Sequence, residues 1–113
     1  MESNLDLKNQ RVELEWIDEK GNIIEKSQIN FIYIIDVLLK IKDFKRKYVW
    51  LSTIDYYGNT FFNVQQVPIV IKELNDLRKE KINLDVKTTI SESASFLNKV
   101  NMKVHTYIKF VGD

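Results

Sequence analysis

The chain has 113 residues, of which 44% are hydrophobic and 29% charged, a composition typical of one folded globular domain. Because it contains no cysteine, a disulfide scaffold, a thiolate metal site and a cysteine nucleophile are all excluded. The net charge of +1 is too small to steer the whole chain toward nucleic acid or an anionic membrane.

The N-terminus and the longest apolar run argue against a leader or a membrane-spanning segment. Glu2 and Asp6 stand where a signal peptide has basic residues, and no apolar stretch follows them. Residues 29–41 are rich in apolar side chains but too short for a spanning helix, which takes about 20 residues. We therefore expect a cytoplasmic protein with a single domain over residues 1–113, in which residues 1–9 are the candidate disordered segment.

Two strands joined by a turn are expected first. Polar and apolar residues alternate over residues 11–17, which predicts a half-buried strand with Trp16 on its buried face. Residues 18–22 are turn formers, so residues 23–26 can return as the second arm of a hairpin.

Residues 31–42 allow two interpretations. Their apolar spacing predicts a helix, with Ser27 or Asn30 as its N-cap. Residues 29–35 are also rich in β-branched and aromatic side chains, as a buried strand would be. The leucines and lysines that continue to residue 42 favour the helix.

A central strand is expected over residues 48–54, which are rich in aromatic and β-branched side chains. Residues 55–59 then form a turn in which Gly58 or Asn59 can take a positive φ. A short returning strand over residues 60–62 completes this part of the chain.

Two helices and a last strand are expected in the second half. Pro68 suits the first turn of a helix, and apolar residues recur at helical spacing over residues 67–77. Thr89 and Glu92 match a capping box, which predicts the start of a further helix. Alternation over residues 104–111 predicts a strand.

The resulting element order is β-β-α-β(-β)-α-α-β. Hairpins and unevenly spaced helices, without a regular series of βαβ crossovers, favour an α+β fold. The expected architecture is an antiparallel sheet of about four to five strands with about three helices packed on it.

The densest cluster of polar and aromatic side chains surrounds the turn that follows residue 54. It comprises Asp55, Tyr56, Tyr57, Thr60, Asn63 and Gln66, which His105 and Tyr107 would join if the last strand lies beside residues 48–54. Such groups at a strand end could bind a polar ligand or a protein. They also have structural uses, since Asp forms turns and Asn63 could cap the following helix. His105 is the single histidine, and the acids around it lack the spacing of a metal site.

A basic run offers a different chemistry. Residues 40–47, among them Lys45, Arg46 and Lys47, sum to a charge of +4 and lie beside the aromatic residues Phe44, Tyr48 and Trp50. Cations beside aromatic rings suit single-stranded nucleic acid, although the net charge of +1 disfavours this interpretation.

Two segments resemble a group of small bacterial proteins of uncharacterised function. Asp55, Tyr57, Gly58, Thr60, Phe62, Asn63 and Gln66 match a D-x-Y-G-x-T-x-F-N…Q stretch, and His105, Tyr107, Ile108, Phe110, Gly112 and Asp113 match an H-x-Y-[LI]-x-F-x-G-D tail. Tyr56 departs from the group, which often has proline at that position. The resemblance covers about a quarter of the chain; it implies a bacterial origin and no particular chemistry.

No catalytic residue or cofactor is assigned, because the chain has no phosphate-binding glycine loop and no nucleophile or metal motif. We favour a protein-binding module, of the kind that serves as an immunity or antitoxin-like partner, with Trp16, Trp50, Tyr56 and Tyr57 as anchors if they are exposed. An alternative is small-ligand binding or enzyme chemistry at Asp55, Tyr57 and His105, and a third is single-stranded nucleic acid binding by residues 40–50. The partner protein is not identified, and self-association through residues 29–41 stays open.

Overall fold

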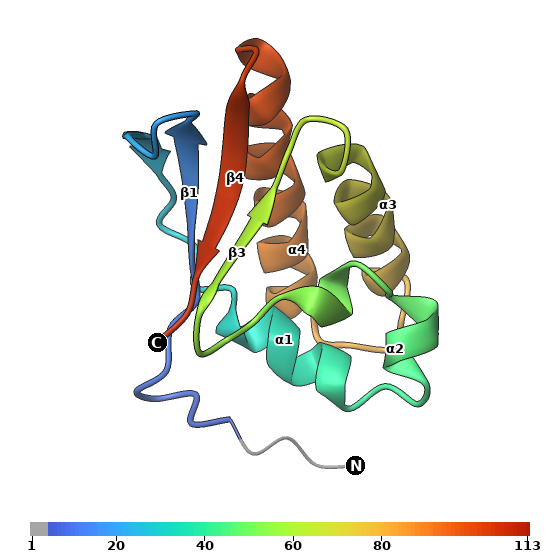
Figure 1. Cartoon of the computed structure of the whole chain (residues 1–113). Coiled ribbons are helices and arrows are strands. Elements are labelled where there is room, and N and C mark those ends of the chain that lie inside the picture. Colours follow the sequence, from blue (N-terminus) through green and yellow to red (C-terminus); the bar gives the residue numbers. More distant parts are fainter. Residues whose placement is uncertain (1–4) are drawn as a thin grey trace.

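The strands of residues 5–113, the part of the chain that this computed structural model describes, form one antiparallel sheet in the order β2-β1-β4-β3. Helices cover one face of the sheet (Figure 1). In chain order the elements are β1 (Glu13–Asp18), β2 (Ile23–Lys26), α1 (Ile32–Leu39), α2 (Phe44–Lys47), the 3-10 helix η1 (Leu51–Thr53), β3 (Asn59–Phe62), α3 (Val67–Leu77), α4 (Leu84–Leu97), the 3-10 helix η2 (Asn98–Met102) and β4 (Thr106–Val111). The α+β fold with an antiparallel sheet is therefore confirmed.

The N-terminal segment can be followed only in part. Residues 1–4 of the candidate disordered segment lie outside the described residues. In residues 5–9 the Asp6 carboxylate accepts hydrogen bonds from the Lys8 backbone N–H and the Asn9 amide, at 3.2 and 2.8 Å.

The core lies between the sheet and the helices, and strand alternation selects its members. In β4, Thr106, Ile108 and Phe110 are buried, whereas the residues between them are half-buried. The Phe110 ring meets the rings of Phe31 and Phe62 edge-on, with centroid distances of 4.9 and 5.7 Å. This aromatic cluster joins β4 and the edge strand β3 to the start of α1.

The helix expected after residue 30 forms as α1, which ends at Leu39 rather than at residue 42. Asn30 organises its start, because its side-chain oxygen accepts hydrogen bonds from the N–H of Ile32 and of Val12, at 3.2 and 3.1 Å. The apolar residues Ile32, Ile34, Ile35 and Leu38 are buried in the chain's own core. The strand alternative for residues 29–35 is therefore wrong.

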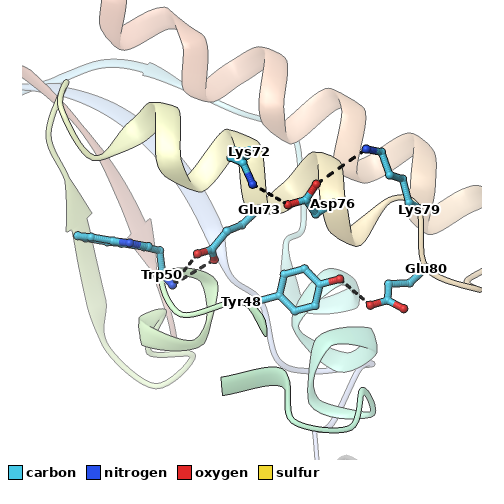
Figure 2. Close-up of polar contacts among 7 residues, drawn as sticks. All are labelled: Tyr48, Trp50, Lys72, Glu73, Asp76, Lys79 and Glu80. Carbon is cyan, nitrogen blue, oxygen red and sulfur yellow. Dashed lines mark hydrogen bonds and ion pairs between the residues drawn. The ribbon is translucent and has the colours of Figure 1, made fainter. Parts of the chain in front are cut away.

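The central strand expected over residues 48–54 does not form. The segment instead leaves α2 and enters η1, and α3 determines this path (Figure 2). The Glu73 carboxylate accepts hydrogen bonds from the N–H of Trp50 (3.1 Å) and of Leu51 (2.9 Å). These two groups begin the 3-10 turn, so a carboxylate distant in sequence overrides the strand propensity of residues 48–54.

Two boundaries in the second half also differ from expectation. Thr89 does not cap a helix: α4 begins at Leu84, and the Asn83 side chain caps it by accepting from the Val86 N–H at 2.9 Å. Thr89 lies inside the helix and its hydroxyl donates to the backbone carbonyl of Asp85. The last strand begins at Thr106, two residues later than expected. Helix α3 forms where Pro68 and the apolar spacing predicted it.

Candidate functional site

The sheet register divides the predicted polar cluster. Asn59 of β3 is opposite Val111, at the end of β4, whereas His105 precedes the first residue of that strand. At about 3.4 Å per residue, the two ends of β4 are about 17 Å apart. The structure therefore does not bring His105 to the turn that contains Asp55. His105 is exposed, with a φ of +59°.

The turn before β3 is organised by its own side chains. The Asp55 carboxylate accepts a hydrogen bond from the Tyr57 N–H at 2.9 Å, and the Asp55 N–H donates to the Thr60 hydroxyl at 2.9 Å. Asp55 and Thr60 thus join the two sides of the turn. Their polar groups serve its geometry, which is the structural alternative considered for this cluster.

The C-terminal residues brace the same turn. The N–H of Gly112 donates to the Gly58 carbonyl at 2.7 Å, and the N–H of Asp113 donates to the Tyr56 carbonyl at 3.2 Å. A Cβ on Gly112 would lie 2.6 to 2.7 Å from backbone atoms of Tyr56 and Gly58, so only glycine fits. The Asp113 carboxylate in turn accepts from the Arg11 N–H at 2.9 Å. The two segments that carry the sequence resemblance are therefore in direct contact.

The loop after β3 is also organised by hydrogen bonds of its own side chains. The Asn63 side-chain oxygen accepts from the N–H of Gln65 and of Gln66, each at 2.9 Å, and the Gln66 side-chain oxygen accepts from the Asn63 N–H at 2.9 Å. This reciprocal arrangement resembles a capping box and precedes α3 directly. Asn63 therefore orders the loop before α3 rather than capping the helix, whose N-cap is Gln66 and has no side-chain hydrogen bond.

Between these braced loops, β3 is an edge strand with exposed apolar side chains. Tyr57, Phe61 and Val64 are 66, 52 and 43% exposed. Gly58 and Thr60 face β4 in the ladder, so alternation directs the backbone N–H and C=O of Asn59 and Phe61 outward. Neither backbone is hydrogen-bonded across that edge to any residue in the range 5–113. We call Tyr57, Asn59, Phe61 and Val64 the β3 edge surface.

Of the four aromatic residues expected to anchor a partner, one has an exposed side chain. Trp16 is buried, Trp50 and Tyr56 are half-buried, and Tyr57 is exposed. Sequence reasoning missed Phe61, whose ring faces solvent with the Lys109 ammonium 5.7 Å from its centroid. The sequence contained a signal for this exposed ring, because successive side chains of a strand point to opposite faces of the sheet, so Phe61 and Phe62 cannot both face the core.

The predicted nucleic-acid residues are exposed, whereas Tyr48 beside them is buried and Phe44 and Trp50 are half-buried. Lys45, Arg46 and Lys47 lie on α2, and Lys47 pairs with Glu80 at 3.4 Å. Tyr48 is buried and its hydroxyl donates to Glu80 at 2.6 Å, so its ring cannot stack on a base (Figure 2). Burial and the neighbouring Glu80 raise the pKa of Tyr48 above its usual range, and the same hydrogen bond lowers the pKa of Glu80.

Tyr107, the remaining predicted site residue, lies half-buried on the sheet face that no helix covers, opposite Ile17 of β1. Within residues 5–113 no three His, Asp or Glu side chains are grouped closely enough to hold a metal ion. No helix in that range is long and apolar enough to cross a membrane. Comparisons with protein-family models, curated proteins and solved structures found no match to the chain.

Proposed function

We propose that the chain is a protein-binding module that contacts its partner through the β3 edge surface. The observation that supports this is an edge strand with outward backbone groups and exposed Tyr57, Phe61 and Val64. An extended segment of another protein can add to such an edge, with its main chain giving affinity and its side chains giving specificity.

The braced loops strengthen the proposal. The contacts of Gly112 and Asp113 fix one end of β3, and the reciprocal bonds of Asn63 and Gln66 fix the other. A surface that is rigid before binding loses little conformational entropy when the partner docks. Aromatic side chains such as Phe61 and Tyr57 are those most often found at the energetic centre of an interface.

An immunity or antitoxin-like role in the bacterial cytoplasm is the specific form of this proposal. A protein of that kind works by covering a surface of another protein, and it needs no cofactor and no catalytic group of its own. The polar groups of Asp55, Thr60, Asn63 and Gln66 are already used to shape loops, which favours binding over catalysis.

The test begins with a tagged pull-down from the native cell, with and without nuclease, and mass spectrometry of the eluate. A stoichiometric protein partner that resists nuclease is expected. Binding of that partner is then measured for Phe61→Ala, Phe61→Pro and Leu84→Ala. Leu84 is the control, because it is an apolar residue 76% exposed at the start of α4, away from β3.

Loss of the ring in Phe61→Ala is expected to cost roughly 2 kcal/mol, or about 30-fold in Kd. Phe61→Pro also removes the outward N–H and is expected to bind the partner more weakly still. The variant should nevertheless fold, because edge strands tolerate proline where the N–H faces solvent. The Leu84 variant should bind normally. If Phe61→Pro is folded and binds the partner as tightly as the unmodified chain, the proposal is wrong.

A further inference from the structure

A second surface lies in the segment between α1 and α2, outside β3, and has different chemistry. Residues 39–46 line a pocket of about 610 Å³ that includes the turn between α1 and α2. Three lining residues are half-buried and apolar, namely Leu39, Ile41 and Phe44, and four are exposed cations, namely Lys40, Lys42, Lys45 and Arg46. The pocket therefore combines apolar side chains with positive charge.

Most of this charge is uncompensated. Lys40 pairs with Asp36 at 3.2 Å, but Lys42, Lys45 and Arg46 form no ion pair with any residue in the range 5–113. Asp43 is the one acid that lines the pocket. Exposed cations that form no ion pair within the chain can pair with a bound anion without first breaking such an ion pair.

The positive surface extends beyond the pocket. An adjoining cavity of about 520 Å³ shares Lys40, Ile41 and Lys42 with it and adds Lys81 as well as Lys47, which is paired there with Glu80. A partner that reaches into the second cavity would therefore meet Lys42 and Lys81, which form no ion pair within the described part of the chain, beside the Lys47–Glu80 pair.

We propose that this basic pocket binds an acidic segment of a partner protein that carries an apolar side chain. Carboxylates of the segment would face Lys42, Lys45 and Arg46, and the apolar side chain would contact Ile41 and Phe44. The combination distinguishes a peptide from a nucleic acid. Single-stranded nucleic acid binds through several aromatic rings that stack on successive bases, whereas Tyr48 is buried in the core and Phe44 is the one aromatic residue among the described residues that line the pocket.

The inference is independent of the β3 edge surface, so the two can fail separately. The probe is a short fluorescent peptide of aspartates and glutamates around a central Leu-Phe pair. Its binding is measured by anisotropy beside two comparison probes: the same peptide with serines in place of Leu-Phe, and a single-stranded oligonucleotide of similar charge. The Leu-Phe peptide is expected to bind best, with an affinity that falls as salt rises.

Two charge-reversed variants locate the site. Lys45→Glu with Arg46→Glu should weaken peptide binding by more than about tenfold. Lys8→Glu with Lys20→Glu makes the same change in net charge outside the pocket and should leave most of the binding intact. Phe61→Pro should bind the peptide normally, which separates this result from the proposed function. Equal binding of the serine peptide, tighter binding of the oligonucleotide, or no effect of the Lys45 and Arg46 changes would each overturn the inference.

Discussion

Replacing Glu73 by alanine tests the main tertiary contact that shapes the segment before β3. Both carboxylate oxygens lie 3.1 Å from the Trp50 nitrogen, and one lies 2.9 Å from the Leu51 nitrogen (Figure 2). Alanine leaves these two backbone N–H groups without their acceptor and removes a negative charge from the start of η1.

The size of the effect follows from these contacts. A hydrogen bond to a charged group contributes about 1.5–3 kcal/mol, and loss of an N-cap costs about 0.5–2 kcal/mol. Because one carboxylate serves both donors, the terms do not add fully, and we expect Glu73→Ala to lower the free energy of unfolding by about 2–3 kcal/mol. Glu73→Gln keeps an oxygen acceptor but loses the charge, so it should cost about 1 kcal/mol.

Urea denaturation at neutral pH measures this, with the midpoints compared at a constant slope. Lys72→Ala is the control on the same helix, because Lys72 forms an exposed pair with Asp76 at 3.2 Å that should contribute less than about 1 kcal/mol. If Glu73→Ala lies within about 0.5 kcal/mol of the unmodified chain, or matches Glu73→Gln, the carboxylate does not hold η1 as argued.

Gly112→Ala should lower the free energy of unfolding by about 1–3 kcal/mol, because its Cβ would meet backbone atoms of Tyr56 and Gly58. Gly58→Ala, whose Cβ meets a side chain instead, should cost less in the same urea titration, and the opposite order would contradict the packing argument. The hydrogen bond from Tyr48 lowers the pKa of Glu80 below 4.5, so the unfolded chain binds this proton at higher pH and stability is lost as pH falls below 4.5. Tyr48→Phe should make the unfolding free energy less dependent on pH in this acidic range, and an unchanged slope would show that the hydroxyl is not responsible.

The sequence predicted elements whose signals are local. The first strand, the turn at Gly21 and the helix after Pro68 each depend on neighbours a few residues apart, and all three appear in the structure. The half-buried pattern expected for the first strand does not, because Leu14, Glu15, Trp16 and Ile17 are all buried. The strand expected over residues 48–54 failed because its outcome depends on Glu73, a residue in a different helix. Strand propensity describes which conformation a segment prefers in isolation. Here the conformation of the segment is determined by a carboxylate that is distant in sequence.

The candidate site divides in the same way. Asp55, Tyr57 and Thr60 meet in the turn before β3, whereas Asn63 and Gln66 lie in the loop at its other end, so the strand between them separates the predicted cluster. Whether His105 joined them depended on the pairing partner of β4, which composition does not reveal. The contact between Gly112 and Gly58 is also a product of strand register, and it joins the two segments that carry the sequence resemblance.

The sheet order has a consequence for how the protein folds. The two central strands, β1 and β4, come from opposite ends of the chain, and Glu13 is opposite Val111. Closing so long a loop costs entropy before any pairing contact compensates for it, and folds dominated by such contacts take milliseconds to seconds to form. Until β4 arrives, β1 and β2 are an isolated hairpin, which is marginally stable at best in water. Folding of the sheet should therefore be cooperative and slow, with the meeting of β1 and β4 as its rate-limiting event.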